Sequence, residues 1–362
     1  RLRLFNRVAL DGLCVLDYHR DTMFYAGRVV VPLRSVRPFS GTVALGDVSL
    51  DGVRFRLMQD STRRTNLWQI LQKVKRKHKK ERKPFRLTAA SLAISDMDFR
   101  HRKFDVRSKE YGVNFTDLDV CDFNLRVSDI VVVNDSVNLS IDSLSLRERC
   151  GLRIETLTTP RLTISGTGMH FERLRVRTPE SDARLTYLYF DYPTWKSYGD
   201  FLHRVDIRAE FSRSQVDFRT IAYFAQGLRD WHSVLRDASG TVSGPVAAMR
   251  GSIGEVTLRD TKLGLRFAID GLPDVKRTRF VFDVTSLETN AADVEYILQD
   301  IARTSLGEKL PMFERAGRIG FSGRFDGLLS DFTASGDLET DLGRAAVRFN
   351  VKPSEQAATA FE

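Results

Sequence analysis

Residues 137–177 read VNLSIDSLSLRERCGLRIETLTTPRLTISGTGMHFERLRVR, and most of the chain follows the pattern of this stretch. Its apolar residues stand two apart, with Ser, Thr, Asp, Glu and Arg between them. A period of two is typical of a strand with one apolar and one polar face. The parity shifts at some points, as from Ile141 to Leu144. Because one face stays apolar only if such a shift is absorbed locally, we expect a bulge or tight turn at each shift.

The alternation continues over most of the 362 residues and predicts a mainly β fold. From Phe85 to about Phe218 the apolar groups recur roughly every 8–12 residues, and strands punctuated by glycine follow. The repeat is not exact, so neither a propeller nor a strict solenoid is indicated. The Asp-Gly steps at 11–12 and 51–52 predict tight turns between strands.

Two or three short helices are expected among these strands. The period changes at 218–235, where Asp217 is the expected cap, and again at 291–303. A further helix is expected from Leu67 to about Lys80, capped by Thr65 or Asn66. Its apolar stripe consists of Leu67, Ile70, Leu71 and Val74.

The net charge of +9 comes mainly from one run, KVKRKHKKERK at 73–83. This run contributes +7, so the rest of the chain is nearly neutral at +2. The plain interpretation is a solvated helix end, where cations favour the helix dipole. A patch for acidic lipid head groups is the functional alternative. Nucleic acid ranks lower, because no aromatic residues interleave with the run. The candidate head-group contacts are Lys75, Arg76, Lys77, Lys79 and Lys80.

No catalytic or metal-binding motif is present, so we expect neither an enzyme nor a cofactor. The six histidines are scattered, and the three cysteines (Cys14, Cys121, Cys150) have no zinc-binding spacing. We expect these cysteines to be packing residues or surface thiols, and their disulfide state stays open. Glycines at 317, 320 and 323 lie among strand-like neighbours. We expect them at turns or bulges rather than in a phosphate-binding loop. Asp96 and Asp98 are expected on a wet strand face.

The second half of the chain resembles the N-terminal portion of the TamB family, in the AsmA-like group of periplasmic proteins. The resemblance is carried by FERLRVRTPESDARLTYLYFDY (171–192), SQVDFRTIAYFAQGL (214–228), VSGPVAAMRG (242–251), GLPDVKRTRFVFDVTSLETNAADV (271–294) and RIGFSGRFDGLLSDFTASGDLETDLGRA (318–345). DGVRFRL (51–57) and TNLWQIL (65–71) fit the way such proteins begin. The resemblance covers about residues 50–350 and includes no single diagnostic motif.

This resemblance implies an elongated, curled antiparallel β-sheet, a β-taco with an open apolar groove. Members carry phospholipids between the inner and outer membranes of Gram-negative bacteria along this groove. The resemblance also implies a periplasmic protein anchored by an inner-membrane helix before Arg1, with a C-terminal domain, absent here, that meets an Omp85-type outer-membrane barrel. No run in this chain is apolar enough for a membrane span, and no signal peptide is visible. The sequence starts at Arg1 without Met and stops without a clear terminator, so we expect it to be part of a longer protein.

The expected organisation has four parts, which are N-terminal strands at 1–62, a helix with a polybasic end at 63–84, a β-groove at 85–352 and a loose tail at 353–362. The apolar face either closes on itself or is filled by lipid tails. Periodicity leaves both open, and the resemblance favours a groove. The expected groove lining is Leu92, Ile94, Phe115, Val120, Leu125, Leu139, Ile141, Leu144, Leu146, Ile154, Leu162, Ile164, Leu174, Val176 and Ile207.

Three other functions compete with lipid transport between membranes. An assembly factor for outer-membrane proteins would act with the Omp85-type barrel and use strand edges as templates. A structural or adhesive β-protein would have a dry, closed core. A nucleic-acid binder would show steep salt dependence centred on residues 73–83.

Overall fold

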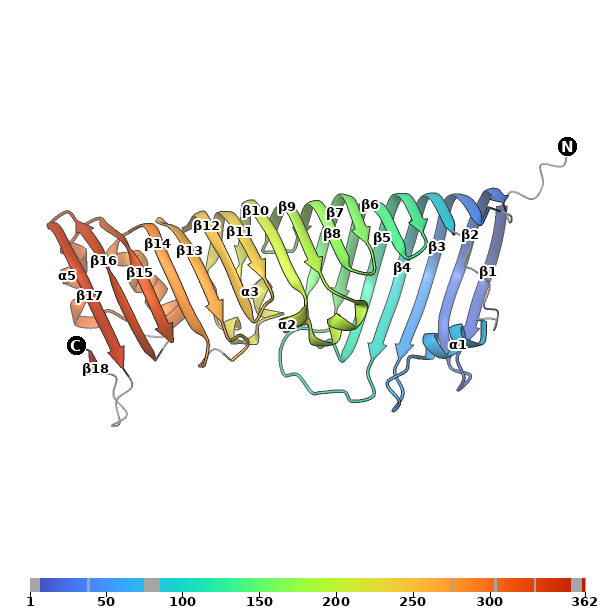
Figure 1. The fold of residues 1–362 in the computed structure, drawn as a ribbon, viewed down its shortest axis with the longest axis horizontal. Coiled ribbons are helices and arrows are strands. Elements are labelled where there is room, and N and C mark those ends of the chain that lie inside the picture. Colours follow the sequence, from blue (N-terminus) through green and yellow to red (C-terminus); the bar gives the residue numbers. More distant parts are fainter. Residues whose placement is uncertain are drawn as a thin grey trace. The chain divides into compact units, whose positions relative to one another are not determined.

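The computed structural model describes residues 7–37, 40–74, 85–274, 276–302, 305–328, 330–352 and 360–361. The prediction of a mainly β fold with antiparallel strands and a few short helices is confirmed (Figure 1). The chain forms two compact units. Unit 1 comprises residues 1–165, 171–180 and 220–229, and unit 2 comprises residues 166–170, 181–219 and 230–362.

Unit 1 is built from long strands. Its elements are β1 (Arg7–Leu16), β2 (Thr22–Arg37), β3 (Thr42–Met58), α1 (Asn66–Val74), β4 (Arg86–Arg102), β5 (Asp117–Val133), β6 (Ser136–Glu148), β7 (Arg153–Ile164), most of β8 (Gly168–Arg177), the end of α3 (Phe218–Ala222) and the 3-10 turn η2 (Gln226–Leu228).

Unit 2 has shorter strands and more helical segments. Its elements are β9 (Asp182–Asp191), η1 (Trp195–Asp200), α2 (Phe201–Arg204), β10 (Asp206–Asp217), β11 (Val234–Gly244), β12 (Ala248–Leu258), β13 (Thr261–Asp270), β14 (Arg279–Thr289), α4 (Ala291–Ile297), the π-helical η3 (Leu298–Ala302), η4 (Gly307–Lys309), α5 (Leu310–Arg315), β15 (Ile319–Leu328), β16 (Asp331–Thr340), β17 (Gly343–Lys352) and β18 (Ala360–Phe361).

Consecutive strands pair with each other within each unit, with one change of direction in unit 1. β1 to β3 pair antiparallel, and so do β4 to β7. β3 and β4, however, run parallel. A parallel pair needs a crossover connection, and the segment that contains α1 supplies it. In unit 2 the strands from β9 to β17 all pair antiparallel with their neighbours.

The expected parity shifts are absorbed by bulges inside strands. The pairing of β4 with β5 shifts between Ile94 and Met97, and between them Asp96 has a positive φ of 53°. Asp122 and Asp129 in β5 have similar angles, 52° and 54°. A left-handed residue at a bulge returns the next apolar side chain to the original face and bends the strand. The bends are visible in Figure 1, where the long strands of unit 1 turn over along one edge.

The prediction of tight turns at the two Asp-Gly steps is wrong. Gly12 lies inside β1 with φ +68°, and Gly52 lies inside β3 with φ +59°. Asp-Gly favours positive φ, which a hairpin turn and a left-handed glycine inside a strand both use, so the dipeptide does not distinguish them. Asp51 pairs with Ser95, the residue before Asp96, so the left-handed residues Gly52 of β3 and Asp96 of β4 lie side by side.

Helix α1 is fastened to the strands by polar groups. The Thr65 hydroxyl accepts a hydrogen bond from the Trp68 amide at 3.1 Å, so Thr65 rather than Asn66 is the cap. Asn66 is buried instead, accepting from the Met58 amide at 3.1 Å and donating to the Arg56 carbonyl at 3.0 Å. The description of α1 ends at Val74, so the predicted continuation to Lys80 lies outside the described residues.

The helix expected at 218–235 is mostly absent. α3 has five residues, η2 has three, and β11 begins at Val234. Asp217 caps as expected, accepting from the Arg219 amide at 2.8 Å. Asp217 also pairs with Val234 across the β10–β11 ladder. Because Val234 belongs to this strand pair, the helix that the sequence period predicts does not extend to residue 235. The helix expected at 291–303 is present as α4 followed by η3, up to Ala302.

Two buried carboxylates hold α4 and η3 to the strands of unit 2. Asp293 accepts from the Asp260 amide and the Thr261 hydroxyl, both at 2.9 Å. Asp300 accepts from the Ser233 amide at 2.9 Å and the His232 amide at 3.0 Å. Burial raises the pKa of Asp300, but the hydrogen bonds from Ser233 and His232 outweigh this effect, so its pKa lies below the ordinary value.

We expect Asp96→Val to lower the free energy of unfolding by about 1–2 kcal/mol, because a β-branched residue tolerates positive φ poorly. Asp96→Gly should be neutral or stabilising. Asp98→Val is the matched control, because Asp98 is an exposed residue of the same strand without positive φ. Urea unfolding measures all three. Equal effects of the two valine substitutions would contradict the assigned bulge.

We expect Asp300→Asn to destabilise the protein by about 1–3 kcal/mol near neutral pH, because buried donors lose a charged acceptor. A carboxyl group with a lowered pKa stabilises the fold above its unfolded pKa, and this contribution is lost as the pH falls through the folded value. The stability difference between wild type and variant should therefore shrink below about pH 4. Thermal unfolding across pH measures it, with the exposed Asp331→Asn as control. A pH-independent difference would contradict the role of the charge.

Candidate functional site

The apolar residues of unit 1 form rows that run across the strands. Residues paired directly across two strands lie on the same face of the sheet. One row crosses all seven strands from β1 to β7, and we call it the central row. It consists of Leu10, Val29, Leu50, Ile94, Leu125, Leu144 and Leu157. At a strand spacing of about 4.8 Å it extends over about 29 Å.

A second row lies nearer the β2–β3 turn, and we call it the outer row. It consists of Val36, Val43, Leu87, Val132, Val137 and Ile164. On the far side of the central row, Phe24, Phe55 and Phe99 pair across β2, β3 and β4. The ring centres lie 6.3 Å apart for Phe24 and Phe55 and 5.6 Å apart for Phe55 and Phe99. The rows together make the apolar face of unit 1.

The opposite face is polar on β5 and β6. Ser143, next to Leu144, pairs with Arg126 across β5 and β6. Arg147 forms an ion pair with Asp122 at 2.7 Å. Such exposed pairs contribute little to stability. The alternation of apolar and polar residues therefore gives the sheet one apolar and one polar, solvent-facing side, as predicted from the sequence.

The apolar face of unit 1 is only partly buried. The ends of its rows are open to solvent, since Leu10 is 45% exposed and Val36 is 53% exposed. Within the central row Val29 is buried, whereas Ile94 and Leu144 are half-buried. Helix α1 packs mainly against β3, and its nine residues cannot cover seven strands. Most side chains of the apolar face therefore contact each other without a described helix of unit 1 over them.

The structure places fourteen of the fifteen expected lining residues in strands, and none of these fourteen is exposed. Ile94, Leu125 and Leu144 belong to the central row, and Ile164 belongs to the outer row. The remaining strand residues are Leu92 in β4, Val120 in β5, Leu139, Ile141 and Leu146 in β6, Ile154 and Leu162 in β7, Leu174 and Val176 in β8 and Ile207 in β10.

Phe115 lies apart from the other expected lining residues. It precedes β5, in the connection from β4, and its side chain is 58% exposed. The alternation of Val113 and Phe115 resembles that of a strand, but the Asn114 side chain accepts from the Thr116 amide at 3.0 Å and forms a local turn instead.

Unit 2 carries rows of the same kind, which the sequence pattern did not predict. One crosses β12 to β17 and consists of Val256, Leu263, Leu287, Phe321, Leu338 and Ala345. A neighbouring row contains Phe282 and Phe325, whose ring centres lie 5.7 Å apart. The alternation within each strand was visible in the sequence, but the pairing register that aligns the strands was not.

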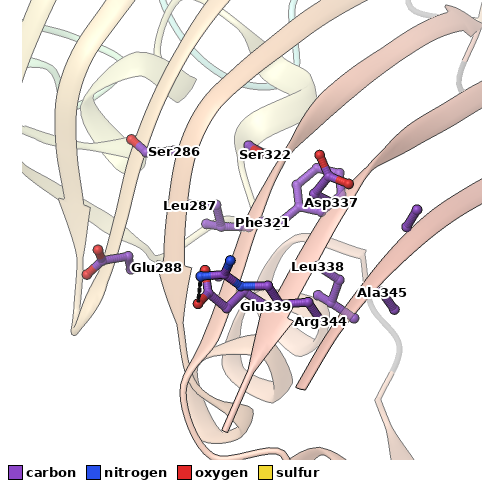
Figure 2. A pocket seen from close by; sticks show the side chains of 12 residues that line it. Ser286, Leu287, Glu288, Phe321, Ser322, Asp337, Leu338, Glu339, Arg344 and Ala345 are labelled. Atoms are coloured by element: carbon purple, nitrogen blue, oxygen red, sulfur yellow. Dashed lines mark hydrogen bonds and ion pairs between the residues drawn. The ribbon is translucent and has the colours of Figure 1, made fainter. Parts of the chain in front are cut away.

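A hollow of about 620 Å³ lies over the first of these rows (Figure 2). Leu287, Phe321 and Leu338 line it together with polar neighbours, and Arg344 pairs with Glu339 at 2.7 Å at its margin. A side chain at Gly323 or Gly336 would collide with the Phe321 ring. These glycines therefore leave space for the ring.

Gly320 and Gly323 lie inside β15, in regular pairing with β16. The pairing of β15 with β14 shifts between Gly323 and Phe321, so a bulge lies beside Gly323 as expected, whereas Gly320 lies at neither a turn nor a bulge. Gly317 precedes the strand and has φ +68°, as at a turn. The sequence spacing gave no sign that a ring from the same strand occupies the space beside Gly323.

The other candidate residues form no site in the described part of the chain. Lys75, Arg76, Lys77, Lys79 and Lys80 lie outside the described residues. The three cysteines are free, and burial together with the hydrogen bond to Glu148 raises the pKa of Cys150 to about 11. Among the residues that the structure describes, no group of three metal-ligating side chains is found.

No family model, curated protein or solved structure matches the chain. In the described ranges, none of the helices combines the length and apolar character needed to cross a membrane.

We expect Leu144→Ala to cost about 1 kcal/mol in free energy of unfolding, because this side chain is already half in contact with solvent. Leu162→Ala removes the same atoms from a side chain that is only 6% exposed, and should cost about 2–3 kcal/mol. Urea unfolding of both variants measures the difference. Equal losses of the larger size would show that the central row is covered in solution.

Proposed function

We propose that this chain is a segment of a lipid-transport protein of the TamB type, whose apolar face holds phospholipid acyl chains between two membranes. The central row is the observation that carries the proposal. It presents seven aliphatic side chains in a line, on a face that no described helix of unit 1 covers. No catalytic residue is needed for this function.

The physical basis is the burial of apolar surface on both partners. Each methylene of an acyl chain removed from water contributes about 0.8 kcal/mol, and the row side chains gain a similar benefit for the area they bury. Aliphatic side chains recognise no particular head group, so the contact suits lipids that differ in their polar part. The polar opposite face keeps the rest of the sheet in water.

The resemblance of the sequence to TamB proteins supports the same proposal and extends it to the periplasm. In that setting the protein would connect to the inner membrane through a preceding helix and to an Omp85-type barrel through a following domain. These partners belong to the proposal, as does the direction of transport from one membrane to the other.

The test is native mass spectrometry and lipid extraction of the protein purified with minimal detergent. We expect phospholipid to co-purify with the wild type and to be lost in Leu144→Asp, because a charge on the row repels acyl chains. Ser143→Asp is the matched control. Ser143 is the preceding residue on the polar face, opposite Arg126, and its variant should retain lipid.

Folding of each variant is checked by circular dichroism and thermal unfolding. A folded Leu144→Asp variant without lipid, beside a lipid-bearing Ser143→Asp, supports the proposal. Ile164→Asp repeats the test on the outer row. A stable wild type that carries no lipid would contradict it and favour the alternative of an assembly factor acting through strand edges.

A further inference from the structure

Strand β1 is the last strand of unit 1 on the side of the N-terminus, and its outer edge is open (Figure 1). In the described part of the chain, β1 pairs with β2 and with no further strand. Residues 7–12 are all exposed. The free N–H and C=O groups of an edge strand can pair with another chain, and short length, proline or lysine commonly prevents this. β1 has ten residues and contains neither proline nor lysine, so its edge can accept a further strand.

The straight part of this edge is symmetrical about one residue. Gly12 has φ +68°, which interrupts the extended backbone, so the straight part that the structure describes runs from Arg7 to Asp11. Its middle residue is Ala9. In an antiparallel pair of two copies, a two-fold axis beside Ala9 places the two Ala9 residues opposite each other. Arg7 of each copy then lies opposite Asp11 of the other copy.

The charges of the two copies match in this arrangement. Arg7, Ala9 and Asp11 share one face of β1, since alternate residues of a strand point to the same side. Each Arg7 would therefore meet a carboxylate of the second copy, and opposite charges directly across two strands stabilise the pair. Asp11 can accept this second cation, because its ion pair with Arg28 is long, at 3.9 Å, and its side chain is 85% exposed.

The apolar side chains match as well. Leu10 begins the central row, and Val8 lies on the same face of β1 with 43% of its side chain exposed. In the two-fold pair, Val8 of each copy would lie opposite Leu10 of the other, so both side chains lose contact with water. An axis beside Leu10 would place Asp11 opposite Ala9, and an axis beside Asp11 would place two carboxylates opposite each other. Of these three axes, only the one beside Ala9 pairs opposite charges.

We propose that two copies of this chain associate through the outer edge of β1, as an antiparallel strand pair with its two-fold axis beside Ala9. The apolar faces of the two copies become continuous across this pair. The straight segment is short, so the interface is small and we expect a Kd in the micromolar range. The proposal does not depend on lipid binding, because the backbone edge and the two ion pairs need no ligand.

The test is sedimentation velocity of the 362-residue chain from about 1 to 100 μM at about 0.1 M salt. We expect the wild type to pass from monomer to dimer over this range. Arg7→Asp and Asp11→Arg each replace two attractive pairs by two repulsive ones, so each should raise the Kd about tenfold or more. Arg126→Asp is the matched control. Arg126 is an exposed residue of the interior strand β5, and its variant should dimerise like the wild type.

The double variant Arg7→Asp with Asp11→Arg restores both ion pairs with their signs exchanged, and should dimerise like the wild type. An equimolar mixture of the two single variants should form a heterodimer, because two acidic groups of one chain then face two basic groups of the other. Circular dichroism checks that each variant is folded. A monomeric wild type at every concentration would overturn the proposal, and so would a double variant or a mixture that stays monomeric.

Disulfide cross-linking tests the register. Directly opposite residues of an antiparallel pair have Cα atoms about 4.5–5.5 Å apart, which a disulfide can span. In a chain with Cys14→Ser, Ala9→Cys should therefore give a covalent dimer on oxidation. Val8→Cys is the control, because the two Val8 residues are offset along the strands and should cross-link poorly. Equal cross-linking of the two variants would contradict the axis beside Ala9.

Discussion

Cross-strand pairing of apolar side chains is the interaction on which unit 1 depends. Each member of the central row has apolar partners on the neighbouring strands, so a face that no described helix of unit 1 covers still forms a continuous contact network. Such pairs contribute up to about 1 kcal/mol each. The pairing register must therefore be kept along strands of up to 17 residues. A slip of one strand by one residue would move its apolar side chains to the polar, solvent-facing side of the sheet.

Residues with left-handed backbone conformations allow the strands to bend while the pairing register is kept. Asp96, Gly52 and Asp122 take left-handed conformations that a straight strand does not use. The Asp96 amide donates to the Asn124 side chain at 3.1 Å, so the polar group freed by the bulge finds a partner on the next strand. Local strain at a few residues thus keeps one face apolar on both sides of each bend.

Much of this could be predicted from the sequence, because period and parity are local properties. The alternation from Val137 to Ile164 indicated the strands, and the shift at Leu144 indicated a bulge. The Asp-Gly steps, the parallel pairing of β3 with β4 and the loss of the helix after Asp217 could not be predicted, because each depends on a distant partner strand. The rows themselves depend on register, which no single segment encodes.

The two units stabilise their helices in different ways. In unit 2, Asp293 and Asp300 are buried carboxylates that each satisfy several donors, so α4 and η3 are fixed by charge-assisted hydrogen bonds. In unit 1, the buried group that holds α1 to β3 is the neutral side chain of Asn66. The Asn66 attachment therefore does not titrate, whereas protonation removes the charge from the Asp300 attachment.

The antiparallel ladders of each unit have a consequence for how such a protein can change in length. A row grows by one strand spacing when a strand is added, so an inserted hairpin extends it by about 10 Å without altering existing pairs. The width of the face depends instead on the residues per strand and the position of the bulges. The length of the rows and the width of the face can therefore vary independently. Duplication of a hairpin in the gene would lengthen the face while leaving its width unchanged.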